Sequence, residues 1–137
     1  MKAVSLFSCA GIGELLLDTL SVKTIVANEL IPKRSLAYKA LHPNSKIITG
    51  DIREREIKEE IFKFSSENPE ILIATPPCQG LSSVGKNKVI EQLNVDKRNF
   101  LIFEIIEVIK RFDFKYILIE NVPKYIEMSF PKGNKLY

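Results

Sequence analysis

Apolar and polar positions follow two different periods along this chain. Short runs rich in Val, Ile and Ala are typical of strands, and longer stretches with an apolar residue every third or fourth position are typical of helices. The short runs predict strands at residues 2–7, 23–28, 46–49, 70–74 and 115–119. The longer stretches predict helices at residues 14–20, 32–41, 54–64 and 98–112. Residues 80–95 have weak periodicity and many polar side chains, which favours a loop.

The alternation of strands and helices predicts an α/β fold with a mostly parallel sheet and right-handed crossovers. In such sheets ligands bind beyond the carboxyl ends of the strands. The unusual residues of this chain follow the predicted strands, at positions 8–13, 28–29, 51, 76–79 and 120–121. We therefore expect one binding site along one edge of the sheet.

Composition limits the class of protein. A chain of 137 residues with 45% hydrophobic and 27% charged residues is typical of one globular domain. The net charge of +3 permits a nucleic-acid partner without indicating one. No apolar run is long enough to cross a bilayer, and no signal peptide precedes the first glycine turn. Two cysteines without a signal peptide indicate a reducing, intracellular setting, and a single His makes a zinc site unexpected.

Polar residues after the first three strands are candidates for binding a nucleotide-like ligand. Gly11 and Gly13 would let the backbone approach a ligand, although a tight strand-to-helix turn explains them equally well. Glu29 has the spacing of an acid that binds ribose hydroxyls; the alternative is a solvated carboxylate. Asp51 could accept a hydrogen bond from an adenine amino group, or it could cap the following helix.

Chemically reactive residues follow the fourth and fifth strands. Pro76 and Pro77 stiffen the chain directly before Cys78, which makes this loop a good platform for a nucleophilic thiolate; the alternative is a buried structural cysteine. Cys9 replaces a small turn residue and is expected to pack. Glu120 is a candidate general acid or a partner for a ring nitrogen, unless it only ends the strand.

Six segments, in this order, resemble motifs of the cytosine carbon-5 DNA methyltransferases. The first segment is Leu-Phe-Ser-Cys-Ala-Gly-Ile-Gly at 6–13. The two most specific segments come later in the chain, Pro-Pro-Cys-Gln at 76–79 and Glu-Asn-Val at 120–122. The intermediate motifs of the family resemble Asn-Glu at 28–29, Gly-Asp-Ile at 50–52 and Asp-Lys-Arg-Asn at 96–99. The resemblance covers essentially the whole chain.

This resemblance implies a Rossmann-like fold, S-adenosylmethionine as methyl donor and double-stranded DNA as substrate, in a cytoplasmic restriction-modification system of a prokaryote or virus. Cys78 would attack carbon 6 of a flipped cytosine and Glu120 would contact its ring nitrogen 3. The residues expected to hold the cofactor are Phe7, Gly11, Gly13, Glu29, Asp51, Ile52, Pro76 and Leu101. The residues expected to touch DNA are Ser82, Ser83, Lys86 and Lys88.

The family continues with a Gln-Arg-type motif, a target-recognition domain and a late segment that completes the cofactor pocket, and none of these is present in the 137 residues. We therefore expect residues 1–137 to be the N-terminal part of a catalytic domain, inactive alone and with its sheet incomplete on the C-terminal side. Such a part arises from a truncated gene, from a deliberately shortened chain, or as one subunit of a split enzyme whose second polypeptide supplies the missing motifs.

Four other functions are open at this stage. An RNA-directed cytosine methyltransferase shares these motifs, and a non-catalytic half could bind cofactor and complement a second chain. An amino-methyltransferase is disfavoured because an aromatic residue would follow its Pro-Pro pair, where this chain has Cys78. An NAD-dependent dehydrogenase is disfavoured because the glycine pattern lacks its third Gly.

Overall fold

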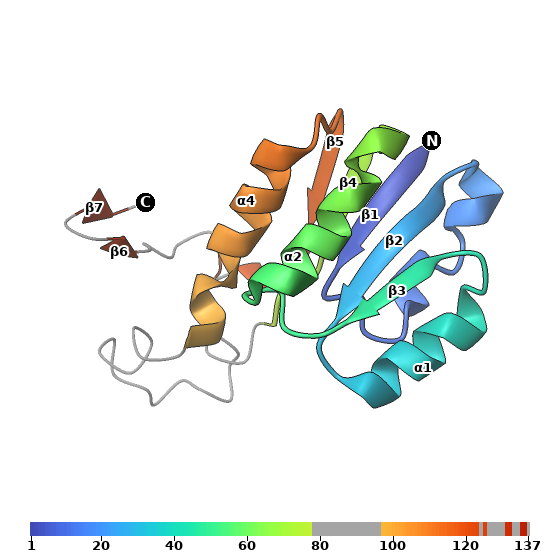
Figure 1. Cartoon of the computed structure of the whole chain (residues 1–137), viewed down its shortest axis with the longest axis horizontal. Helices are drawn as coiled ribbons and strands as arrows, with labels where there is room; N and C mark the ends of the chain where they lie inside the picture. The colour runs from blue at the N-terminus through green and yellow to red at the C-terminus, as the bar shows by residue number, and fades with distance from the viewer. Residues whose placement is uncertain (78–96, 124, 126–130, 133–134, 137) are drawn as a thin grey trace.

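A computed structural model of the chain describes residues 1–77, 97–123, 125, 131–132 and 135–136. Within these residues, five parallel strands form one sheet in the order β3-β2-β1-β4-β5 (Figure 1). The strands are β1 (Lys2–Leu6), β2 (Lys23–Glu29), β3 (Lys46–Thr49), β4 (Ile71–Ala74) and β5 (Tyr116–Ile119). Leu6 lies opposite Asn28 on one side and opposite Ala74 on the other, so the carboxyl ends of the central strands are level. The predicted parallel sheet is confirmed.

Helices cover the two faces of the sheet. They are α1 (Pro32–Leu41), α2 (Arg55–Phe62) and α4 (Ile102–Arg111). Figure 1 shows α2 and α4 side by side over one face, where Ile61 and Ile105 pack with Leu6 in the main hydrophobic core. Successive side chains of a strand point to opposite faces, so Ser5 points to the other face, toward Tyr38 of α1 and its hydrogen-bond partner Glu14. This second face has a buried polar cluster centred on Glu14.

The expected helix at 14–20 was wrong. Two short 3₁₀ turns, Ile12–Glu14 and Leu17–Leu20, take its place, and Ser21 ends the second in the left-handed conformation. The side chain that points inward is the polar Glu14, while Leu16 and Leu20 are exposed. The leucine pattern predicted an apolar helix face, but a buried carboxylate occupies the position that this face would have taken.

The other boundaries differ by a few residues. The helix expected at 98–112 begins as a 3₁₀ turn, Lys97–Leu101, before α4, and the helix expected at 54–64 becomes α2 followed by a 3₁₀ turn at Lys63–Glu67. A short antiparallel pair, β6 (Pro131–Lys132) and β7 (Lys135–Leu136), was not predicted. The loop expected at 80–95 lies outside the described residues. None of the helices in the described part combines the length and apolar character that crossing a bilayer requires.

The strand β5 forms one edge of the sheet and is open to solvent. It pairs only with β4 among the described strands, and all four of its residues are exposed, with Tyr116 and Leu118 at 59%. Parallel sheets are normally covered on both faces, as β1 and β2 are here. The β5 edge is therefore an apolar surface of unusual extent for such a sheet.

Candidate functional site

A cavity of about 320 Å³ opens at the carboxyl ends of β1, β2 and β4. It lies where the strand-end rule predicted a site, and it brings together Phe7, Glu29, Asp51, Ile52 and Leu101 from the set expected to bind cofactor. The remaining lining residues are Cys9, Asn28, Leu30, Ile31, Arg34, Gly50, Arg53, Thr75, Pro77 and Arg98. The lining thus combines apolar side chains with polar and charged groups that could orient a small-molecule ligand.

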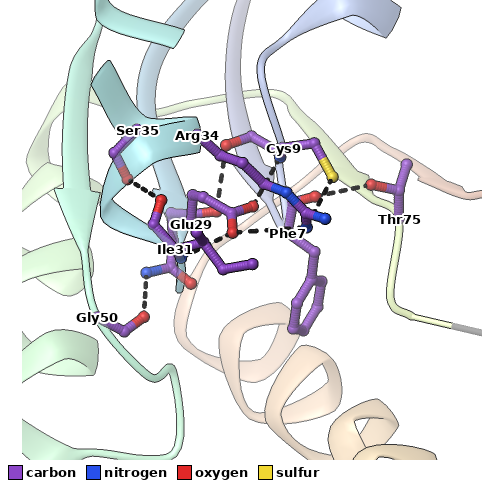
Figure 2. Close-up of polar contacts among 10 residues, drawn as sticks. Phe7, Cys9, Glu29, Ile31, Arg34, Ser35, Gly50 and Thr75 are labelled. Carbon is purple, nitrogen blue, oxygen red and sulfur yellow. Dashed lines mark hydrogen bonds and ion pairs between the residues drawn. The ribbon is translucent and has the colours of Figure 1, made fainter. Parts of the chain in front are cut away.

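Glu29 is the buried acid of this cavity, at 4% exposure. One carboxylate oxygen accepts a hydrogen bond from the backbone N–H of Cys9 at 2.9 Å, and the other accepts one from Ile31 N–H at 2.8 Å (Figure 2). Each oxygen of a carboxylate can accept two bonds, so Glu29 retains capacity to accept hydroxyl donors from a ligand. The solvated-carboxylate alternative is therefore excluded by the burial of Glu29.

Three hydrogen bonds from two side chains join the ends of adjacent strands at this site. Asn28 is buried, and its amide donates to the carbonyl oxygens of Ile48 and Gly50 at 3.0 and 3.1 Å, which holds the end of β3 against β2. The hydroxyl of Thr75 donates to the carbonyl of Phe7 at 3.0 Å and joins the ends of β4 and β1. None of these bonds was predicted, because each depends on the register between strands.

Asp51 forms an ion pair at the rim of the cavity. Both of its carboxylate oxygens accept hydrogen bonds from the guanidinium of Arg53, and Oδ1 also accepts the backbone N–H of Arg53 at 2.9 Å. Hydrogen bonding from Arg53 holds the pKa of Asp51 below its usual range, against a smaller opposing effect of burial. The helix that follows is capped at Glu54 without a side-chain bond, so Asp51 is not its cap.

Cys9 was expected to pack and instead is exposed in the cavity wall. Its backbone has a φ of 51°, in the left-handed region, and Phe7 has a φ of 60°. These angles bend the chain sharply after β1, so the side chain of Cys9 points away from the core. The guanidinium of Arg34, on α1, lies 3.8 Å from Cys9 Sγ and 4.0 Å from a Glu29 oxygen (Figure 2).

Other predicted site residues lie beside the cavity or outside the described residues. Gly11 is buried within the turn after β1 and Gly13 is exposed, and neither lines the cavity. Pro77 lines it, whereas Pro76 is buried and does not. Glu120 is exposed at the end of β5, next to Asn121, whose amide donates to the carbonyl of Pro76 at 3.0 Å. The positions outside the described residues are Cys78, Ser82, Ser83, Lys86 and Lys88.

The basic residues of the cavity, Arg34, Arg53 and Arg98, were not predicted as site residues. Arg53 directly follows the Gly-Asp-Ile segment, which was the one available signal for it. Arg34 lies on a helix of mixed polarity, which carries no such signal. Within the described residues, no group of three His, Cys, Asp or Glu side chains could hold a metal ion.

The sheet order and the cavity at its carboxyl edge define a Rossmann-like α/β fold with a ligand-binding edge. Solved structures support this at the level of the fold. The S. pombe Dnmt2 methyltransferase matches with a TM-score of 0.64 and 20% identity over 93% of this chain and 36% of that chain. An E. coli prophage-encoded protein of the same fold matches with a TM-score of 0.69 and 24% identity over 90% of this chain and 32% of that chain.

Residues 1–133 match the family model of the C-5 cytosine-specific DNA methylases, and the chain belongs to that family. Among curated relatives, it is 45% identical to the Type II methyltransferase M1.HgaI of Avibacterium volantium, over 99% of this chain and 38% of that protein. It is 37% identical to the Type II methyltransferase M.NgoPII of Neisseria gonorrhoeae, over 89% of this chain and 33% of that protein. The chain thus spans between a third and two-fifths of the length of these relatives.

Proposed function

We propose that this chain is the cofactor-binding and nucleophile-bearing part of a DNA cytosine-5 methyltransferase of a restriction-modification system. The observation that carries the proposal is the contact between two strand ends. β4 and β5 are paired in parallel with Ala74 opposite Ile119, and Asn121 donates to the carbonyl of Pro76. In the sequence, Cys78 follows Pro76 by two positions and Glu120 directly precedes Asn121. We therefore assign Cys78 and Glu120 to one catalytic corner.

The proposed reaction uses these two residues on a cytosine that has left the DNA stack. The thiolate of Cys78 forms a bond to carbon 6, while Glu120 holds ring nitrogen 3 and favours this addition. Carbon 5 then has the electron density to accept a methyl group. The proton on carbon 5 then passes to solvent water, its bonding electrons form the double bond between carbons 5 and 6, and the electrons of the bond to Cys78 leave with the sulfur. This restores both the aromatic ring and the free thiolate.

The cavity residues fit S-adenosylmethionine, which supplies an electrophilic methyl group on its sulfonium. The spare acceptor capacity of Glu29 suits the ribose hydroxyls, and the apolar side chains of Ile31, Ile52 and Leu101 suit an adenine ring. Asp51 suits the adenine amino group, although its carboxylate is already hydrogen-bonded to Arg53.

A further polypeptide segment is proposed to cover the exposed apolar surfaces. The β5 edge lacks a second neighbour among the described strands, and Ile12, Leu16, Leu20 and Leu36 are exposed by 65–75%. Apolar surface of this extent marks a protein interface. We propose that the segment is the remainder of a methyltransferase catalytic domain, supplied by the same protein or by a second polypeptide, and that it acts with this chain on double-stranded DNA in the cytoplasm.

Complementation tests this function. The purified chain alone is expected to transfer no labelled methyl group to duplex DNA. Co-expression with the part of M1.HgaI that this chain does not match is expected to restore transfer. A chain that methylates DNA alone would contradict the proposed need for a further segment, and preference for tRNA over duplex DNA in the same assay would contradict the DNA assignment.

The nucleophile is tested in the complemented enzyme. Cys78→Ala is expected to abolish methyl transfer, because it removes the thiolate proposed to form the bond to carbon 6, and to leave binding of the cofactor nearly unchanged. Cys9→Ala is the matched control for loss of a thiol. Substantial turnover by Cys78→Ala would show that Cys78 is not the nucleophile.

A further inference from the structure

A buried polar cluster lies behind the glycine turn, on the side away from the cavity. Its centre is Glu14, which is 6% exposed and accepts hydrogen bonds from three hydroxyls. Ser5 of β1 donates at 2.5 Å, Thr24 of β2 at 3.0 Å and Tyr38 of α1 at 2.7 Å. The proposed reaction gives this buried carboxylate no task, although the cluster joins three elements to one turn.

Tyr38 extends the cluster to His42, the residue after α1. Tyr38 is fully buried, and burial, followed by the nearby carboxylate of Glu14, raises the pKa of Tyr38 well above its usual range. Its hydroxyl therefore remains protonated and donates to Glu14. The ring of Tyr38 stacks on the imidazole of His42, with ring centroids 4.5 Å apart.

His42 in turn contacts the backbone of the glycine turn. Its Nε2 lies 2.9 Å from the carbonyl oxygen of Gly11, and because a carbonyl can only accept, Nε2 carries the hydrogen that is donated. Gly11 has a φ of 75°, and a Cβ built on it would lie 2.5 Å from His42 Nε2 and 2.7 Å from the ring of Tyr38. The two rings thus pack directly against the turn.

The same turn is held from the cavity side by Glu29, whose carboxylate accepts the N–H of Cys9 at 2.9 Å. Within the turn, Gly11 N–H donates to the carbonyl of Ser8 at 2.8 Å. The conformation of residues 8–13 therefore depends on two sets of contacts, one from the acid that lines the cavity and one from the rings behind it.

We propose that Tyr38 and His42, anchored by Glu14, are positioning residues that hold the glycine turn in the conformation that binds the methyl donor. The inference rests on the proposed function, because it takes the cavity as the donor site. Neither side chain lines the cavity, so both act through the backbone of Gly11.

Two measurements on the full chain test this proposal. Hydrogen-deuterium exchange of the peptide covering residues 8–14 reports on the turn whether or not a ligand binds. Calorimetry with S-adenosylhomocysteine reports on the donor site. His42→Phe keeps an aromatic ring against Tyr38 but removes the donor to Gly11. It is expected to speed exchange in the turn and to weaken affinity, each by about tenfold, as for one lost hydrogen bond.

Three further variants separate positioning from general stability. His42→Gln retains an N–H donor and is expected to recover most of both effects, and Tyr38→Phe, which loses the bond to Glu14, is expected to give a smaller change than His42→Phe. Ile61→Val removes a methyl group from the core on the opposite face of the sheet and lowers the melting temperature without touching the turn. It is expected to keep wild-type affinity and wild-type exchange at residues 8–14.

The results distinguish failure of this inference from failure of the proposed function. Unchanged exchange in His42→Phe, or the same increase in Ile61→Val, would overturn the positioning role. Faster exchange with unchanged affinity would overturn the link between the turn and the donor. If the wild-type chain does not bind S-adenosylhomocysteine, the cofactor assignment for this chain fails, while exchange that responds to His42 still supports the positioning of the turn.

Discussion

Glu29 has two roles in this structure, and the sequence indicated only one of them. Its position after the second strand predicted a ribose ligand. Its burial and its bonds to Cys9 N–H and Ile31 N–H add a structural role, because they connect the turn after β1 to the start of α1.

Glu29→Ala is therefore expected to lower both stability and cofactor affinity. Leaving two backbone N–H groups without their acceptor costs about 1–3 kcal/mol of unfolding free energy, and the charge-assisted bonds to the donor are lost as well. Urea denaturation and calorimetry measure the two effects. Glu60→Ala, an exposed acid on α2, is the control and is expected to change neither. Wild-type stability of Glu29→Ala would contradict the structural role.

The ion pair of Asp51 and Arg53 makes a prediction about pH. Because Arg53 lowers the pKa of Asp51 in the folded state, the pair stabilises the fold above the ordinary pKa of a carboxyl group, and this contribution is lost as pH falls through the lowered value. Arg53→Ala is expected to return the pKa of Asp51 toward its ordinary value, as measured by NMR titration of the carboxyl carbon. Arg55→Ala, which removes an exposed cation that pairs with Glu59, is the control. A low pKa that persists in Arg53→Ala would show that Arg53 is not the cause.

At the scale of elements, the turn after β1 distinguishes its two glycines. Gly11 has a left-handed φ and no room for a Cβ, whereas a Cβ on Gly13 would meet nothing within 4 Å. Gly11→Ala is expected to destabilise the chain by more than about 1 kcal/mol, through strain and overpacking. Gly13→Ala is expected to leave thermal unfolding unchanged.

The variant Gly13→Ala also tests whether Gly13 belongs to the cofactor site. If the donor packs against this glycine, Gly13→Ala weakens binding of S-adenosylhomocysteine although it does not affect folding. Equal affinity of Gly13→Ala and the wild type would remove Gly13 from the cofactor site.

Strands and site location were predictable because they depend on local pattern. The five apolar runs predicted all five strands of the main sheet within one residue at each end, and the strand-end rule placed the cavity. The helix at 14–20 was not predictable in this way. The conformation of residues 14–20 depends on Ser5, Thr24 and Tyr38. These residues surround Glu14 only after β1, β2 and α1 have packed together. The exposure of Cys9 was missed for a related reason, since it depends on left-handed backbone angles that single residue types do not reveal.

At the scale of the whole molecule, the exposed β5 edge allows a test of the proposal that a further polypeptide segment covers this surface. Leu118 is 59% exposed, so Leu118→Lys is expected to leave the unfolding temperature of the isolated chain nearly unchanged. In the complementation assay, the same variant is expected to reduce methyl transfer strongly, because a charge would be buried in the joined interface. Lys115→Ala, in the residue just before β5, is the control for a change near the edge. Full complementation by Leu118→Lys would exclude the β5 edge as the interface.

The cavity takes its walls from both sides of β1. Glu29 and Asp51 belong to the side with β2 and β3, whereas Thr75 and Leu101 belong to the side with β4 and α4. A ligand in this cavity binds the joined arrangement and not the separated sides, so it stabilises the chain in proportion to its concentration over its dissociation constant. Proteases degrade the opened state, and the lifetime of the chain in a cell then rises with the supply of that ligand. The position of the cavity thus makes the stability of the whole sheet depend on whether a ligand occupies the space between its two sides.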